Sequence, residues 1–465
     1  MAVLAAALLA LQCSPKDDPI TPEPDPTPVT PPDPGPEEPE DLQPLTASIL
    51  DNDDWVWEGR PAITFRVENP NTVAASIDLM VRISTDQKQT LVTLNRTAEI
   101  QAASTQDVVV TTEEDLAPGF YRAACFANKK STKIFFFGID PFQIVSAPDA
   151  EADFDAFWDA AIAQLEAIDM APVLTEIPSR SNANAKCYFV ELKSVPNGLE
   201  GEPETIHGYY LEPQDGKAHP VLMHYYGYDD LTNISKTFCP SGNGQFAEFY
   251  LSTRGQVINN RTADLREDGI AQDFVNTYGD WFAFQFGIRD GYYYRGAFMD
   301  CVQGIRFMAT RPTSDSANIF AEGKSQGGAF SYAAAALSPY PLRAIAPGVA
   351  FLGDFPDYFH IVDWPANVAY AGRDKMGMSD EEMYRFLSYF DTKNLATRIN
   401  RQGIPCAIIA NIGLQDGTCP PHTNIAPYNV VTNPDKEMYF YPKMGHSIPS
   451  GWDSKITTFF KARVQ

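Results

Sequence analysis

Short apolar runs alternate with helical patterns from about residue 147 to the end of this 465-residue chain, and few folds accommodate such an alternation. The runs have the length of buried strands: YFVELKSV, HPVLMHYYG, NIFAEGKS, RAIAPGVAFL, IPCAIIANIG and EMYFYPKM. Helical patterns lie between them, and one begins with Ser379 and Glu382 in the spacing of a capping box. Strands buried on both faces and separated by helices are typical of parallel sheets. We therefore predict a doubly wound, mostly parallel α/β domain over residues 147–465.

A helix is expected where this domain starts. The apolar residues of PDAEADFDAFWDAAIAQL recur at helical spacing: Phe154, Phe157, Trp158, Ala161, Ile162 and Leu165. They form one stripe that would face a core, and acidic residues occupy the first turn.

Residues 46–146 have a different periodicity, with apolar side chains at every second position. The pattern is clearest in AITFRVENP and SIDLMVRIS, and QDVVVTT, GFYRAACFA and KIFFFGI follow without a helical pattern between them. This spacing predicts a small antiparallel β-sandwich of immunoglobulin-like kind. Trp55 and Trp57 suit either an exposed glycan-binding platform or, as we favour, the core of a spacer domain.

The first 45 residues have neither pattern. Residues 1–12 are apolar but too short to span a bilayer, which is typical of a signal peptide. Cys13 follows at once, an arrangement that resembles a bacterial lipoprotein signal. Residues 14–45 hold 12 of the 37 prolines and nine acidic residues, and therefore predict an extended linker. We expect an exported lipoprotein, anchored through Cys13 to the outer membrane or cell surface of a Gram-negative bacterium.

The formal net charge of -25 argues against nucleic acid as a partner, because that binding needs Lys and Arg to neutralise phosphates. The other six cysteines form no Cys-x-x-Cys pair or Cys/His cluster, so a zinc site or a redox pair has no support in the sequence. One or two disulfides are left open. The length suits two folded domains plus unstructured segments.

The segment EGKSQGGAF places Ser325 between an apolar run and a helical pattern. A reversal that tight strains its apex residue and leaves room only for glycine nearby, which accounts for Gly323, Gly327 and Gly328. Such a turn lifts a serine hydroxyl above the edge of the sheet, beside the N-terminal amides of the next helix. Ser325 is therefore the candidate nucleophile.

A serine nucleophile needs a base, and the α/β-hydrolase fold supplies it in the order serine, acid, histidine. Asp416 follows the run IPCAIIANIG, and His446 follows EMYFYPKM, so these residues fit the acid and the base. His207, His219, His224, His360 and His422 do not combine that order with the end of a strand. The backbone amides of Tyr228 and Gln326 are the candidate donors of an oxyanion hole.

Nine segments support a more specific resemblance: DFDAFW, GYDD, RGQ, YYYRGAFMD, GKSQGG, FLGDFP, LSYFDTKNLA, GLQDGTCPP and GH. In this order they resemble the acetyl xylan esterase and cephalosporin C deacetylase family, carbohydrate esterase family seven. By position, the resemblance implies Ser325 as nucleophile, Asp416 as acid and His446 as base, with oxyanion donors at Tyr228 and Gln326. Val257 and Ser447 depart from the family pattern, which usually has glycine and glutamate there.

The resemblance implies a serine esterase that removes acetyl groups from xylan or its oligosaccharides, without a cofactor. Deacetylation of other glycans and general short-chain ester hydrolysis remain alternatives. A further alternative is a non-catalytic glycan-binding lipoprotein that keeps the fold as a scaffold. Family members commonly form hexamers, but the N-terminal sandwich and tether would obstruct that assembly, so homo-oligomerisation is left open.

Overall fold

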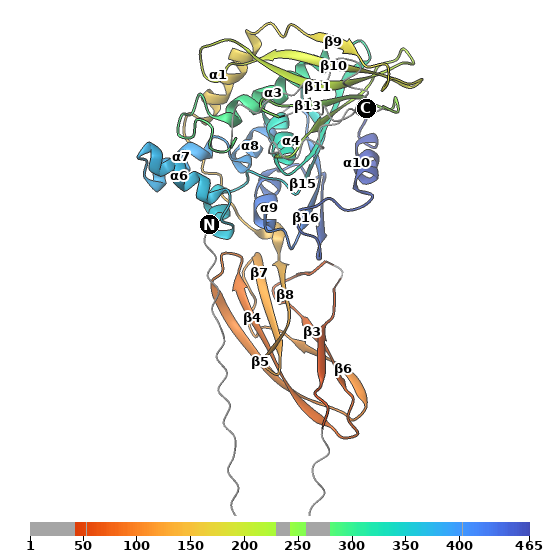
Figure 1. Ribbon diagram of the computed structural model, residues 1–465, viewed down its shortest axis with the longest axis vertical. Coiled ribbons are helices and arrows are strands. Elements are labelled where there is room, and N and C mark those ends of the chain that lie inside the picture. Colours follow the sequence, from red (N-terminus) through yellow and green to blue (C-terminus); the bar gives the residue numbers. More distant parts are fainter. Residues whose placement is uncertain (1–41, 53, 229–241, 257–279, 402) are drawn as a thin grey trace, which may run out of the picture. The chain divides into compact units, whose positions relative to one another are not determined.

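The computed structural model describes residues 42–52, 54–228, 242–256, 280–401 and 403–465 of the chain (Figure 1). The expected signal peptide, Cys13 and nearly all of the linker therefore lie outside the described residues. From Leu45 to Gln465 the chain forms one compact unit. Within the described part, no helix has the length and apolar character that crossing a membrane requires.

The region before residue 146 is all-β and has two sheets. One consists of β1 (Thr46–Ile49), β3 (Ile63–Asn69) and β6 (Ser104–Val110); the other consists of β2 (Val56–Trp57), β8 (Lys130–Ile139), β7 (Gly119–Ala127), β4 (Ala75–Thr85) and β5 (Thr90–Ile100). Alternate side chains of β3 and β4 are buried in a shared core, as the period of two predicts. All neighbouring strands pair antiparallel except β2 and β8, which are parallel.

Trp55 packs inside this sandwich rather than forming a glycan platform. Only 2% of its surface is exposed, and its ring lies 4.1 Å from that of Phe135. Trp57 is half-buried and makes an edge contact with Phe137 at 5.5 Å. Both tryptophans therefore take the packing role that the sequence favoured.

A nine-stranded sheet forms the centre of the second region. Its order is β17-β16-β15-β14-β12-β13-β11-β10-β9, and the six strands from β17 to β13 are parallel. Their bounds are β9 (Val173–Glu176), β10 (Ala185–Ser194), β11 (Glu204–Pro213), β12 (His219–Tyr225), β13 (Ala247–Ser252), β14 (Ser314–Lys324), β15 (Leu342–Gly348), β16 (Ala407–Gly413) and β17 (Lys436–Tyr441). The predicted mostly parallel sheet is confirmed, with an antiparallel extension from β11 to β9.

Helices cover both faces of this sheet (Figure 1). The helices of this region are α1 (Phe154–Glu166), α3 (Tyr293–Ala309), α4 (Gln326–Leu337), α5 (Phe355–Ile361), α6 (Ala366–Met376), α7 (Asp380–Ser388), α8 (Thr392–Ile399), α9 (Pro421–Val430) and α10 (Trp452–Lys461); a 3-10 turn at Pro141–Gln143 precedes α1. Consecutive residues of β16 face opposite cores: Ile408 lies in the main core and Ile409 packs with α10. The predicted capping box is present, because the Ser379 hydroxyl accepts from the Glu382 amide.

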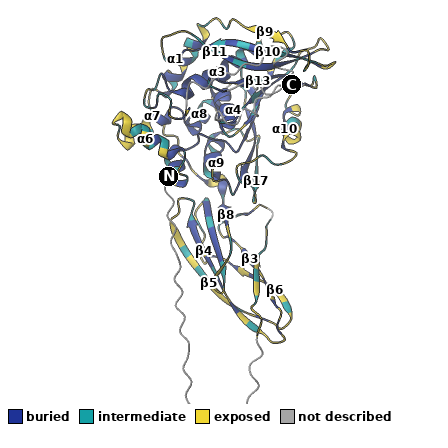
Figure 2. Ribbon diagram, viewed as in Figure 1, coloured by how far each residue is buried: buried dark blue, intermediate teal, exposed yellow. Residues whose placement is uncertain are grey.

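Burial explains why the central helix has no amphipathic stripe. All twelve residues of α4 are buried between the sheet and the neighbouring helices α3 and α8 (Figure 2). This helix begins immediately after Ser325, so its position fixes the turn that carries the candidate nucleophile.

Candidate active site

Ser325 lies at the junction of β14 and α4 with φ 57° and ψ −122°, a backbone conformation that side-chain-bearing residues rarely adopt. The surrounding glycines make this turn sterically accessible. A Cβ on Gly323 would lie 2.6 Å from the backbone of Gly327, and one on Gly327 would overlap the carbonyl oxygen of Tyr225. A Cβ on Gly328 would lie 2.9 Å from Ala350 Cβ. The three glycines therefore permit a strained turn that presents a half-exposed serine.

His446 and Asp416 are brought together although 30 positions separate them in sequence. Nδ1 of His446 lies 2.8 Å from Oδ2 of Asp416. The other carboxylate oxygen accepts the backbone N–H groups of Thr418 and Cys419 at 2.8 and 2.9 Å. The Asp416 side chain is fully buried, whereas 28% of the His446 side chain is exposed. The carboxylate is thus held rigidly and the imidazole remains accessible from solvent.

Cys419 connects the loop of Asp416 to the turn of Ser325. Its thiol lies within hydrogen-bonding reach of Ser325, and its backbone N–H donates to Asp416. Burial raises the pKa of this thiol well above its usual range, so Cys419 stays protonated. The loops after β14 and β16 therefore meet at one point, at the carboxyl ends of their parallel strands.

The loop after β12 packs against the same turn. A Cβ on Gly227 would lie 3.7 Å from Ser325 Cβ, which places the following residue, Tyr228, near Ser325. The Tyr228 hydroxyl donates to Asp280 at 2.6 Å, and its ring packs against Trp281 and Trp364. Gln326 is the first residue of α4, where a backbone N–H has no partner in a preceding turn. These two amides are the candidate oxyanion donors that the sequence suggested.

A buried ion pair positions the loop of Tyr228. Arg254 contacts both carboxylate oxygens of Asp300, at 2.9 and 2.6 Å, and both residues are at most 2% exposed. Two residues further along, Gln256 donates from Nε2 to the carbonyl of Gly227 at 3.1 Å. In the sequence, these residues appeared only as members of the motifs RGQ and YYYRGAFMD, and their contacts were not predicted. Their pairing depends on tertiary contacts between β13 and α3, for which the sequence carries no local pattern.

A separate cluster of potential metal ligands lies at α5 and α9. Oxygen or nitrogen atoms of Asp354, Asp357 and His422 lie within 4.8 Å of one another, and no other such group occurs in the described parts of the chain. Burial alone would lower the pKa of His422, but its hydrogen bonds to Asp354 and Asp357 raise it to about 10. Lys393 also pairs with Asp354 at 2.7 Å. A protonated imidazole cannot ligate a metal, so this donor set suits an ion-pair network.

The remaining histidines lie in other environments. His224 stands between Glu322 and Glu248, at 2.6 and 3.1 Å, and these contacts outweigh burial and raise its pKa to about 9. His207 stacks on Phe189, and burial lowers its pKa to about 4. His219 pairs with Asp215, and His360 is exposed at the end of α5.

The cysteines also bear on the site. Five of them are buried and form no disulfide: Cys125, Cys187, Cys301, Cys406 and Cys419. The disulfides that the sequence left open therefore do not form among these five. Val257 lies outside the described residues, and Ser447 is exposed directly after His446.

The sequence profile of the family described as Acetyl xylan esterase (AXE1) matches residues 143–463. The chain belongs to the acetyl xylan esterase family. It is accordingly a carboxylic ester hydrolase, and the predicted resemblance is confirmed. The match begins where the β-sandwich ends, so the sandwich is additional to the part that the family shares.

Individual members of the acetyl xylan esterase family support this assignment. Acetyl esterase Axe7A of Xylanibacter ruminicola is 24% identical over 344 residues, which cover 74% of this chain and 73% of that protein. Acetyl Xylan Esterase 1 from Thermoanaerobacterium sp. JW/SL YS485 is 25% identical with a TM-score of 0.55. The acetyl xylan esterase from Paenibacillus sp. R4 is 26% identical with a TM-score of 0.56. Each of these two structures is covered over 98% of its length and covers 70% of this chain.

Proposed function

We propose that this protein removes acetyl groups from the hydroxyls of xylan or its oligosaccharides through an acetyl-enzyme intermediate. The observation that carries the proposal is the 2.8 Å pair of His446 and Asp416 beside the strained turn of Ser325. Membership of the acetyl xylan esterase family supports carbohydrate acetyl esters as the substrate class.

In the proposed mechanism, Ser325 Oγ attacks the acetyl carbonyl and His446 Nε2 accepts the hydroxyl proton. Asp416 keeps the other ring proton on Nδ1 and stabilises the imidazolium that forms. The tetrahedral oxyanion accepts hydrogen bonds from the amides of Tyr228 and Gln326. His446 then gives its proton to the departing sugar oxygen. A water molecule, activated by the same imidazole, attacks the acetyl-enzyme and releases acetate.

Ser325→Ala tests the mechanism. Acetate release from acetylated xylan should fall by about 10⁴-fold or more, because loss of a triad member leaves only the oxyanion hole and substrate binding. Thermal stability should change little or rise, since the crowded turn loses an oxygen atom. A variant that retains more than about a hundredth of wild-type turnover would remove Ser325 from the nucleophile role. A panel of acetylated polysaccharides separates xylan from other glycans and from general short-chain ester hydrolysis.

We also propose that the enzyme is a lipoprotein attached to a membrane through Cys13. The support is the sequence alone: an apolar segment, a cysteine at its end and a Pro-rich acidic linker. Stable attachment takes more than one acyl chain, as bacterial lipoproteins carry. Full-length protein expressed in a Gram-negative host should fractionate with membranes, and Cys13→Ala should move it to the soluble fraction. Equal partitioning of the two forms would favour a plain secreted enzyme.

A further inference from the structure

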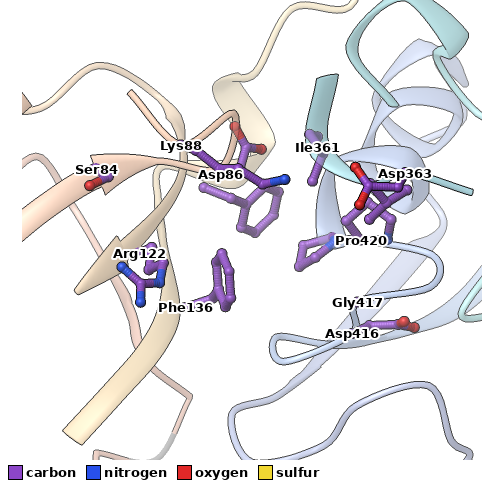
Figure 3. Close-up of a pocket in the computed structure, with 13 residues that line it drawn as sticks. Ser84, Asp86, Lys88, Arg122, Phe136, Ile361, Asp363, Asp416, Gly417 and Pro420 are labelled. Carbon is purple, nitrogen blue, oxygen red and sulfur yellow. The ribbon is translucent and has the colours of Figure 1, made fainter. Parts of the chain in front are cut away.

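A cavity of about 460 Å³ lies between the β-sandwich and loops of the hydrolase domain (Figure 3). Its volume falls in the range of about 300–1,000 Å³ that is typical of small-molecule sites. The sandwich contributes residues of β4, β7 and β8 and of the turn after β4, and the hydrolase domain contributes residues that follow α5 and β16. Its apolar lining includes Phe120, Phe136, Pro420 and Pro421, and four charged side chains also line it: Asp86, Lys88, Arg122 and Asp363.

The cavity adjoins the candidate active site on two sides. Asp416 and Gly417 line it, while the Asp416 carboxylate points away from it, toward His446 (Figure 3). Asp363 lines it as well, and the next residue, Trp364, packs its ring against that of Tyr228 at 5.3 Å. The cavity therefore lies next to the loop of Asp416 and one residue from Trp364, which packs on Tyr228.

Direct contacts hold the two walls of the cavity together. The backbone N–H and C=O of Phe136 bond to the side chain of Gln415 at 2.9 and 3.0 Å. On the other side, Gln87 donates from Nε2 to Asp357 at 3.0 Å. The sandwich is thus fixed against the hydrolase domain on both sides of the cavity.

The charged side chains of the cavity are available to a ligand. In the part of the chain that the structure describes, no hydrogen bond or ion pair engages the side chains of Lys88, Arg122 or Asp363. The fourth group, Asp86, is half-buried next to them. Two cations and two carboxylates balance in charge, so a simple ion would be attracted by one pair and repelled by the other.

Sugar hydroxyls satisfy such a mixed set. Arg and Lys only donate hydrogen bonds and ionised carboxylates only accept them, whereas each hydroxyl can do both. The apolar faces of Phe136 and Pro420 suit the C–H face of a sugar ring. We propose that this cavity binds neutral sugar units next to the acetylated one, with Arg122 and Asp86 of the sandwich bonding to their hydroxyls. The proposal rests on the proposed carbohydrate deacetylase function.

Paired substrates test the cavity. Arg122→Ala and Lys88→Ala are compared with Arg82→Ala, an exposed arginine of the same sandwich that does not line the cavity. The readout is the ratio of kcat/KM on acetylated xylo-oligosaccharides to kcat/KM on p-nitrophenyl acetate. The second substrate is too small to occupy the candidate active site and the cavity together. The ratio should fall about 10-fold to 100-fold for Arg122→Ala, through KM, because a hydrogen bond to a charged group is lost. It should not change for Arg82→Ala. An unchanged ratio for both cavity variants would overturn the proposal.

Direct binding separates this proposal from the proposed function. In the Ser325→Ala background, calorimetric titration with unacetylated xylo-oligosaccharides should give binding that Arg122→Ala weakens by a similar factor. If the wild-type enzyme releases no acetate from carbohydrates but this binding occurs, the proposal of a sugar-binding cavity is kept and the proposed deacetylase function is rejected. If acetate is released but the oligosaccharide does not bind, or binds independently of Arg122, the proposal of a sugar-binding cavity is rejected and the proposed deacetylase function is kept.

Discussion

Phe136 of the sandwich strand β8 bonds through both its backbone N–H and its C=O to the side chain of Gln415. Gln415 immediately precedes Asp416, and its Nε2 also donates to the carbonyl of Pro442 at 2.7 Å. Its own backbone N–H donates to Met444, two residues before His446, at 2.9 Å. One residue thus links the sandwich to the two loops that carry the proposed acid and base.

Gln415→Ala should therefore impair catalysis as well as stability. Removal of the side chain breaks three hydrogen bonds and should destabilise the fold by about 1–3 kcal/mol. We expect kcat on p-nitrophenyl acetate to fall about tenfold while KM changes less than about twofold, because misplacement of the acid and base affects the chemical step. The exposed Gln101→Ala is a matched control in the sandwich. A lower melting temperature with unchanged kcat would limit Gln415 to a structural role.

The sequence predicted most of the parallel sheet because those strands are buried on both faces and appear as continuous apolar runs. It did not predict β5, an edge strand in which Arg96 interrupts the alternate apolar side chains that face the core. It also missed β11 and β13, which mix polar and aromatic residues next to the antiparallel extension. Edge position and partial exposure weaken the periodic pattern of β5. β11 and β13 lie inside the sheet and are largely buried, but polar residues such as His207 and Glu248 interrupt their apolar runs.

The sequence predicted those residues of the candidate site whose identity is required by the local backbone geometry. The turn at Ser325 needs glycines, and strand ends define where an acid and a histidine belong, so these positions have a local pattern. Gln256 and Gln415 have none. Each acts through a contact with a segment distant in the chain, the loop of Gly227 for one and strand β8 for the other.

Gly327→Ala should prevent folding or cost more than about 3 kcal/mol of stability. Its new Cβ would overlap the carbonyl oxygen of Tyr225, a backbone atom of the central strand β12 that has no room to move. Gly403→Ala is the control, because no atom lies within 4 Å of a Cβ there, and its stability should change by less than about 1 kcal/mol. Urea unfolding of the purified variants measures both effects. A Gly327→Ala variant as stable as wild type would contradict the close packing of this turn.

Asp86→Asn should stabilise the protein in a pH-dependent way. Burial raises the pKa of Asp86 from its ordinary 3.8 to about 6, with a lowering contribution from His422 and a raising one from Asp357. As pH rises from about 4 to 6, the unfolded chain loses this proton before the folded protein does, so ionisation disfavours the fold. The variant should gain about 1–3 kcal/mol over wild type at pH 8 and nothing below pH 4. Urea midpoints at pH 4 and pH 8 check this, and a pH-independent difference would contradict the buried carboxylate.

Chain-length specificity should favour acetate over longer acyl groups. The backbone N–H of Phe351 donates to the carbonyl of Ser325 at 3.0 Å, and the Phe351 ring stacks on Trp364 at 5.4 Å. Trp364 in turn packs against Tyr228, so these three aromatic residues form a wall near Ser325, the candidate nucleophile. In an open apolar groove each added methylene would improve binding by about 0.8 kcal/mol. Against a packed wall, it displaces side chains at a cost of about 1–3 kcal/mol.

We therefore expect kcat/KM to be highest for p-nitrophenyl acetate, at least tenfold lower for butyrate and very low for octanoate. Trp364→Leu should narrow the difference between acetate and butyrate, because it removes part of the wall, whereas Trp364→Phe should largely preserve it. Steady-state kinetics on the three esters decides the question without knowledge of the natural sugar. A rate that increases with acyl length in the wild-type enzyme would contradict the proposed deacetylase and favour a general carboxylesterase, even with Ser325 established as the nucleophile.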